Sequence, residues 1–156
     1  MHPHEALVRR FYACLAARDA EGALACYHPE VFLSDPLYPR LRGGTAGDLW
    51  RMRLGEAGFE EITLEEASGD AQGAHARWTA RAVVRDRRVT IRGRSMFAFR
   101  EGRIVRHYDH YSLWRWAAQA LGPAGAALGW FGPFRWALRT RAARRLERFS
   151  AAPADD

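Results

Sequence analysis

From residue 59 onward the apolar residues recur with a period of two, and this pattern limits the possible folds more than any other feature. Strict alternation runs through residues 74–84 and 89–99, and a further strand-like segment covers 59–68. Short turns at 69–73, Asp86-Arg87 and Glu101-Gly102 separate these segments, and turns this short join antiparallel neighbours. The second half of the chain therefore predicts an antiparallel meander that ends in RIVRHYDHYSLW, residues 103–114.

The first 58 residues follow a helical period instead, interrupted by one short apolar strand at 31–33. Leu7, Phe11 and Leu15 recur at four-residue spacing, as on the buried face of an amphipathic helix. Helices followed by a sheet are typical of the α+β class, with the helices on one face of the sheet. Three helices are expected. The first covers residues 4–18, the second runs from its N-cap Asp19 to Cys26, and the third begins at Thr45.

The last 40 residues differ from the rest. Residues 116–134 contain no charged side chain and reach the lower length limit of a membrane span, but Pro123, Pro133 and four glycines favour an irregular hairpin over the domain or against another subunit. The arginine-rich segment that follows is predicted to be a helix. The expected organisation is a domain at 1–115, an apolar and then basic extension at 116–149, and a disordered tail at 150–156.

Composition narrows the function classes. All 24 Lys+Arg residues are arginines, which excludes a Schiff-base or P-loop lysine, and the net charge of +6 allows association with anions. Cys14 and Cys26 lack metal-ligand spacing, so free thiols are expected.

The N-terminus lacks the apolar run of a signal peptide, which favours a cytoplasmic protein. The basic tail lacks an aromatic platform and any known nucleic-acid motif, which disfavours nucleic-acid binding.

Asp35 is the first candidate for chemistry. It follows an apolar strand and precedes a proline, where functional groups are often placed. Apolar surroundings would make its carboxyl a usable general base. The alternative is an exposed turn aspartate that caps its own backbone.

His107 and Asp109 are the second candidate, because side chains two residues apart share one face of a strand. A carboxylate in that position can orient and charge an imidazole. Alternation alone does not say whether this face lines a pocket or meets solvent. His110 faces the other side, so a metal site is disfavoured. Tyr111, Trp78 and Trp50 suit either a core or an apolar pocket.

The order of these elements, with the strand ending in Ser34-Asp35-Pro36 and the meander ending in FAFREGRIVRHYDHYSLW, resembles the nuclear transport factor 2-like superfamily. The SnoaL-like and ketosteroid isomerase-like branch is the most similar part, over about residues 5–115. The resemblance implies a cone, in which a strongly curved, mostly antiparallel sheet wraps a long helix and leaves an apolar pocket at the open end. It also implies that His107, Asp109 and Tyr111 face this pocket.

Residue by residue, the resemblance places Asp35 where ketosteroid isomerases keep their base. Phe11 stands in place of their helix-1 tyrosine, with Tyr12 one position away, and Ser95 replaces the protonated acid of their oxyanion hole. Steroid isomerisation in its usual form is therefore disfavoured. The His-x-Asp of the last strand is instead similar to polyketide cyclases and dehydratases of this superfamily, which use no metal or cofactor.

The resulting hypothesis is acid-base catalysis on a hydrophobic cyclic or aromatic molecule, with Asp109 or Asp35 taking a proton and His107 stabilising the developing charge. The alternative is a ligand-binding module without catalysis, whose extension at 116–149 docks to a membrane surface or a partner subunit. Relatives commonly dimerise through the outer sheet face, where Thr79, Arg81, Thr90 and Arg92 would lie. The expected ligand-binding residues are Phe11, Tyr12, Trp50, Trp78, Ser95, Phe97 and Tyr111.

Overall fold

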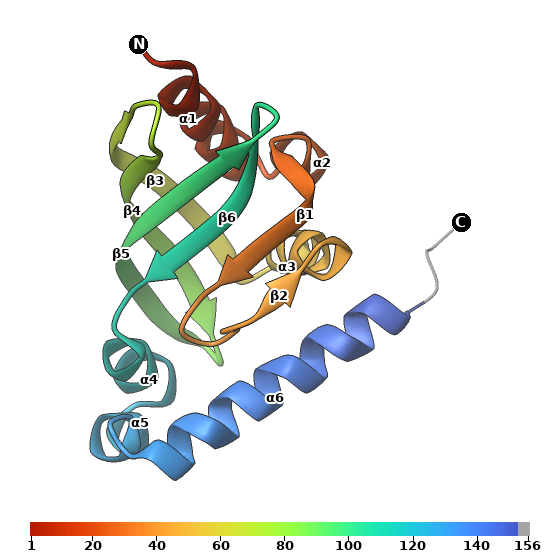
Figure 1. Cartoon of the computed structure of the whole chain (residues 1–156). Coiled ribbons are helices and arrows are strands. Elements are labelled where there is room, and N and C mark those ends of the chain that lie inside the picture. Colours follow the sequence, from red (N-terminus) through yellow and green to blue (C-terminus); the bar gives the residue numbers. More distant parts are fainter. Residues whose placement is uncertain (153–156) are drawn as a thin grey trace.

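The computed structural model describes residues 1–152, and their elements follow the expected order of helices before sheet (Figure 1). The helices are α1 (Pro3–Ala16), α2 (Ala20–Leu24), α3 (Gly44–Gly55), α4 (Leu113–Leu121), α5 (Pro123–Leu128) and α6 (Gly132–Ala151). The strands are β1 (Tyr27–Ser34), β2 (Leu41–Arg42), β3 (Phe59–Gly69), β4 (Ala74–Val84), β5 (Arg87–Arg100) and β6 (Arg103–His110).

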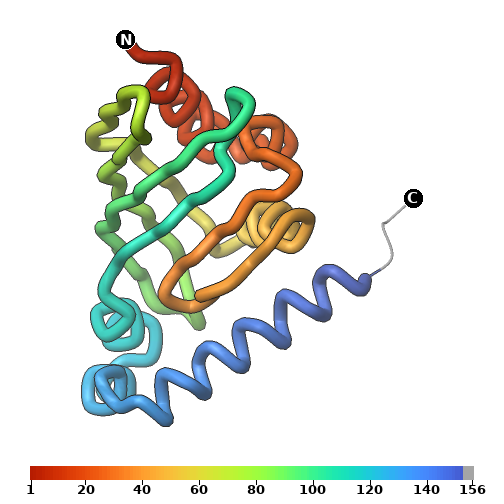
Figure 2. The backbone as a smooth tube through the Cα atoms, in the orientation of Figure 1, coloured from red at the N-terminus to blue at the C-terminus, as the bar shows by residue number. Residues whose placement is uncertain are grey.

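One curved, open sheet with the strand order β2-β1-β6-β5-β4-β3 wraps around α1 and α3 (Figures 1 and 2). All neighbouring strands are antiparallel except β1 and β6, which run parallel. The predicted α+β cone is confirmed. Its core lies between the sheet and α1, where Val8, Phe11 and Leu15 are fully buried.

The parallel pair β1 and β6 decides where the functional residues meet. Leu33 pairs with His107 and Ser34 with Tyr108, so both strands end at the same edge of the sheet. Asp35 follows the last residue of β1, and Asp109 lies near the end of β6. Two segments more than 70 residues apart in the chain therefore place their carboxylates at one end of the cone.

The meander and its turns match the prediction closely. β4 has the expected bounds and pairs in continuous register with β5, which begins at Arg87 and ends at Arg100 and so extends beyond the expected 89–99. Their turn consists of Arg85 and Asp86, both in the left-handed region, one residue before the expected Asp86-Arg87. At the other turn Glu101 and Gly102 also have positive φ angles. β6 stops at His110, however, and not at Trp114, because Ser112 accepts a hydrogen bond from the Arg115 N–H and caps α4.

The first half requires five corrections, of which the first is that α1 ends at Ala16 and not at residue 18. The second helix ends at Leu24 and not at Cys26, because the Cys26 carbonyl accepts from Ile104 N–H and the chain joins the sheet from Tyr27. The strand predicted at 31–33 extends over all of β1 for the same reason, and the short β2 was not predicted. The third helix begins one residue before Thr45, at Gly44.

Residues 113–128 form two helices where an irregular hairpin was expected. Gly122, with φ +67°, ends α4, and Pro123 begins α5. α4 lies against β5, where Gln119 bonds both backbone groups of Thr90. α6 then runs as a long rod past the open end of the cone (Figure 1) and buries Leu146 against the core.

The C-terminal helix extends into the segment expected to be disordered, since α6 continues to Ala151. Residues 153–156 of that predicted tail lie outside the described residues. Between residues 1 and 152 no helix combines the length and apolarity needed to cross a bilayer. Cys14 and Cys26 are free thiols.

Candidate active site

A cavity of about 210 Å³ lies at the open end of the cone. Apolar side chains from α3, β3, β4 and β5 form much of its wall, and Trp116 of α4 and Arg145 of α6 contribute from the extension. The volume is smaller than that of pockets for drug-sized ligands, so a ligand of about one ring would fill it. The polar residues that line it are Tyr12, Asp35, Tyr38, Arg53, Glu56, Asp109, Tyr111 and Arg145.

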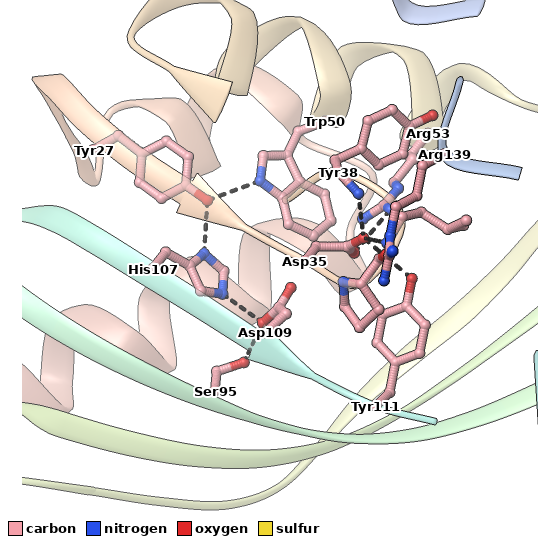
Figure 3. A network of polar contacts seen from close by, with 12 residues as sticks. Tyr27, Asp35, Tyr38, Trp50, Arg53, Ser95, His107, Asp109, Tyr111 and Arg139 are labelled. Carbon is pink, nitrogen blue, oxygen red and sulfur yellow. Dashed lines mark hydrogen bonds and ion pairs between the residues drawn. The ribbon is translucent and has the colours of Figure 1, made fainter. Parts of the chain in front are cut away.

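Asp109 lies in the middle of a buried chain of hydrogen bonds (Figure 3). Its Oδ1 accepts from His107 Nε2 at 2.7 Å and also from the Ser95 hydroxyl. His107 Nδ1 lies 2.8 Å from the Tyr27 hydroxyl, which accepts from Trp50 Nε1 at 2.8 Å. Both bonds of the carboxylate end on Oδ1, so Oδ2 is the oxygen available to a ligand in the cavity.

Indole N–H groups fix the direction of this chain, because they can only donate. The Tyr27 oxygen accepts the Trp50 N–H, and the proton of the Tyr27 hydroxyl then points to His107 Nδ1. His107 Nε2 then donates to Asp109, and every donor in this half of the chain has an acceptor.

Ser95 completes the other half in the same way. Its hydroxyl donates to Asp109 and accepts from Trp78 Nε1 at 2.8 Å. Tyr12 therefore donates to Ser95, at 2.7 Å. Burial, followed by the charge of Asp109, raises the pKa of Tyr12 well above its usual value, so the phenol remains a donor at neutral pH.

Asp109 is an anion at neutral pH. Burial alone would raise the pKa of its carboxyl, but the attraction of His107 and the hydrogen bonds from His107 and Ser95 outweigh it and hold the pKa below the usual value. Arg53 acts in the same direction from a greater distance. His107 itself is fully buried, with Phe97, Trp50 and Phe11 packed around the ring.

The Asp35 carboxylate lies among polar partners and not in the apolar surroundings that would make it a general base. Its Oδ1 accepts from the backbone N–H groups of Leu37, at 2.7 Å, and Tyr38, at 3.1 Å, and from the Tyr111 hydroxyl at 3.2 Å. Its Oδ2 is 3.0 Å from Arg53 Nη2. The carboxylate is buried, but both oxygens are occupied by donors from this chain.

Arg53 connects the two carboxylates to the cavity. Its guanidinium lies over the Tyr38 and Trp50 rings, with its central carbon 5.3 and 5.5 Å from their centroids. Only Nη2 has a hydrogen-bond partner among residues 1–152, and 24% of the side chain is exposed. Burial alone would lower the pKa of Arg53, but Asp35 and then Tyr111 and Tyr38 raise it, so the cation persists.

The structure brings most of the predicted site residues together. Asp35, Asp109, Tyr12, Trp50, Trp78 and Tyr111 line the cavity. His107, Ser95, Phe11 and Phe97 are buried behind this wall and do not line it.

Tyr12 and Phe11 point in different directions, since neighbouring helix positions differ by about 100°. Tyr12 thus supplies the helix-1 hydroxyl, where the resemblance had placed Phe11.

Sequence reasoning missed Tyr27, Tyr38, Arg53, Trp116 and Arg145. Tyr27 was placed beyond the end of a helix, and Arg53 is one of 24 equivalent-looking arginines. No local sequence pattern indicates that a basic residue of α3 will face the Ser-Asp-Pro turn. In the described part of the chain no three His, Cys, Asp or Glu side chains gather as a metal ion would require.

The same fold occurs in many solved structures. An LEH-like epoxide hydrolase from M. tuberculosis is 20% identical, with a TM-score of 0.65 over 81% of this chain and 93% of that one. A protein named as a polyketide cyclase from Xanthomonas campestris is 20% identical, with a TM-score of 0.65 over 76% and 96%. A protein with a ketosteroid isomerase-like fold from Catenulispora acidiphila, in complex with trimethylamine, is 16% identical, with a TM-score of 0.64 over 76% of this chain and 94% of that one.

These identities support the fold alone, and no protein with a curated description matches the chain. The model of the SnoaL-like domain matches residues 8–107, which include most of α1, strands β1 to β5 and β6 as far as His107. Because this match covers more than half of the sequence, the chain belongs to the SnoaL-like domain family.

Proposed function

We propose that this chain catalyses an acid-base step on a small hydrophobic, cyclic or aromatic molecule without a metal or cofactor, of the isomerase, cyclase or dehydratase type. The observation that carries the proposal is the state of Asp109. It is an anion that lines a largely apolar cavity, with Oδ1 bonded to His107 and Ser95 and with no hydrogen-bond partner for Oδ2 among residues 1–152. A carboxylate with a fixed orientation and a free oxygen in a largely apolar site is suited to accept a proton.

Asp109 takes the role of general base and Arg53 that of the electrophile. Oδ2 of Asp109 accepts a proton from a carbon next to a carbonyl, and the electron pair of the broken C–H bond moves to the carbonyl oxygen. Arg53 Nε and Nη1 donate to that oxygen. The protonated Asp109 then returns the proton to the substrate at the carbon that receives it.

Asp35 and His107 act as positioning residues in this proposal. Asp35 fixes the Arg53 guanidinium through Nη2 and leaves two nitrogens for the substrate. His107 has both ring nitrogens engaged and does not line the cavity, so it acts through Asp109. The proton of Tyr12 is used in holding Ser95, whose own proton goes to Asp109.

Proton exchange tests the proposal without knowledge of the natural substrate. Small cyclic ketones, such as 2-cyclohexenone, are incubated with the protein in D₂O, and loss of the α C–H signal is followed by NMR. We expect exchange by the wild type and at least a roughly 100-fold slower rate with Asp109→Asn, the usual size of a general-base contribution. Asp48→Asn, a surface carboxylate paired with Arg51, is the control and should keep the wild-type rate.

Asp109→Asn is well matched to this test, because an amide oxygen can still accept from His107 and Ser95. Equal rates for the wild type and Asp109→Asn would contradict the proposal. Binding of the ketone, seen as a rise in Tm, without exchange by the wild type would favour the alternative of a ligand-binding module without catalysis.

A further inference from the structure

Helices α4, α5 and α6 expose a group of large apolar side chains that the cavity chemistry does not use. Trp130 and Trp136 are each 68% exposed and Phe131 is 45% exposed. Trp114 and Leu128 are also exposed, whereas Trp50 and Trp78 of the domain are buried. We call Trp114, Leu128, Trp130, Phe131 and Trp136 the aromatic corner. Exposed aromatic residues gathered in this way mark an interaction surface.

The charge around the aromatic corner has one sign. From His110 to Leu146 there is no Asp or Glu, and the same stretch contains six arginines. Arg139 bonds the Pro36 carbonyl and Arg145 pairs with Glu56, but no other arginine after residue 110 forms an ion pair within residues 1–152. These unpaired arginines are Arg115, Arg135, Arg141, Arg144 and Arg148.

Three of these arginines form a stripe on α6. Arg141, Arg144 and Arg148 are spaced three and four residues apart, which places them on one face of a helix, and all three are exposed. Leu146 and Arg139, which contact the domain, lie on the opposite side. Trp130 and Phe131 directly precede α6, so the aromatic corner lies at the N-terminal end of this helix, about 14 Å along its axis from the first arginine of the stripe.

We propose that the aromatic corner and the α6 stripe form a docking surface for an anionic phospholipid bilayer. Tryptophan and phenylalanine prefer the interface of a bilayer, and arginines beside them are attracted to anionic head groups. A second copy of the chain would bring the same positive charge to the contact, which disfavours self-association there. A nucleic acid would pair with the arginines but would leave Leu128 and Phe131 without an apolar partner.

The surface belongs to the part of the chain beyond the family match, which ends at residue 107. It is also connected to the cavity, since Trp116 of α4 and Arg145 of α6 line the cavity wall. Docking would therefore bring this wall close to the bilayer, where an apolar ligand is concentrated. The docking proposal is independent of whether the cavity is catalytic.

Vesicle flotation of the full chain tests the proposal. Vesicles of phosphatidylcholine alone are compared with vesicles that contain one quarter phosphatidylglycerol, at 100 mM salt. We expect binding to the anionic vesicles, and roughly a 100-fold loss with Arg141→Gln, Arg144→Gln and Arg148→Gln combined, at about fivefold for each arginine. Trp130→Ser with Phe131→Ser should weaken binding at least tenfold.

The matched control combines Arg88→Gln, Arg92→Gln and Arg94→Gln, because these substitutions remove the same charge from exposed positions on β5. This control should bind like the wild type, and circular dichroism checks that every variant is folded. Absence of binding to anionic vesicles, or an equal loss in the control, would overturn the proposal. So would unchanged binding of the aromatic variant, or its conversion of a dimer to a monomer in sedimentation, which would assign the corner to a subunit interface.

Discussion

Replacing Asp35 with asparagine separates a structural carboxylate from a reactive one. Asp35 Oδ1 accepts three donors, and Oδ2 faces Arg53 at 3.0 Å. An asparagine amide must place its NH₂ either against Arg53 or against Tyr111 and the two backbone N–H groups. In both orientations a donor faces a donor, and the Arg53 cation loses its partner.

The structure sets the size of the expected loss. Removal of one partner from a buried ion pair costs about 3–5 kcal/mol, because the other charge remains buried without compensation. The Arg53 side chain is 24% exposed, so water compensates in part and the lower end, about 3 kcal/mol, applies. For a chain of this length each kcal/mol lowers Tm by about 2–4 °C, so we expect Asp35→Asn to lower Tm by about 6–12 °C.

Urea unfolding followed by circular dichroism measures the free energy of unfolding, with Asp109→Asn and Asp48→Asn in parallel. We expect Asp109→Asn to change it by about 1 kcal/mol or less, since both hydrogen bonds to Oδ1 are retained. Asp48 pairs with Arg51 on the surface, and its loss should cost less than about 1 kcal/mol. If Asp35→Asn is as stable as the wild type but loses proton exchange, the roles given to the two carboxylates are reversed.

Two more predictions address the hydrogen-bond chain. Tyr27→Phe leaves the Trp50 N–H and His107 Nδ1 without partners, so we expect a loss of about 1–3 kcal/mol in urea unfolding, and unchanged stability would show that the chain is not formed. The pKa of Asp109 is lower in the folded than in the unfolded chain. Its contribution to stability is therefore fully present above about pH 4 and is lost as pH falls through the folded pKa. Unfolding free energies from pH 7 to pH 3 should fall more steeply for the wild type than for Asp109→Asn, and parallel profiles would refute the lowered pKa.

Periodicity predicted the faces of the meander except at the beginning of β6. His107 points inward and His110 outward, but Ile104 is also fully buried, because the pairing with β5 shifts by one residue between Ile104 and Arg106 and interrupts the alternation. Whether this face lines a pocket depends on the parallel pairing of β1 with β6, which joins segments more than 70 residues apart in the chain. No local pattern encodes that pairing, so the inward direction came from the family resemblance.

The partners of the two carboxylates could not be predicted for a related reason. Arg53 of α3 contacts Asp35 from 18 residues further along the chain, and Tyr27 contacts His107 across the parallel strands. Such contacts depend on where α3 and β1 lie in three dimensions. Sequence reasoning found the charged pair two residues apart, His107 and Asp109, because that spacing is local.

The direction of the hydrogen-bond chain also determines the route of a proton. Two ends of the chain are indole groups, which have no second proton to pass on and no lone pair to receive one. The third end is the Tyr12 hydroxyl, which donates to Ser95 and belongs to a residue of the cavity wall. Protons therefore cannot pass through either indole, and the Tyr12 branch leads back to the cavity. A proton captured by Oδ2 exchanges with the solvent through the cavity and not through the buried chain. The rate at which a bound ketone loses its α-hydrogen to D₂O is thus limited by the access of water to the cavity.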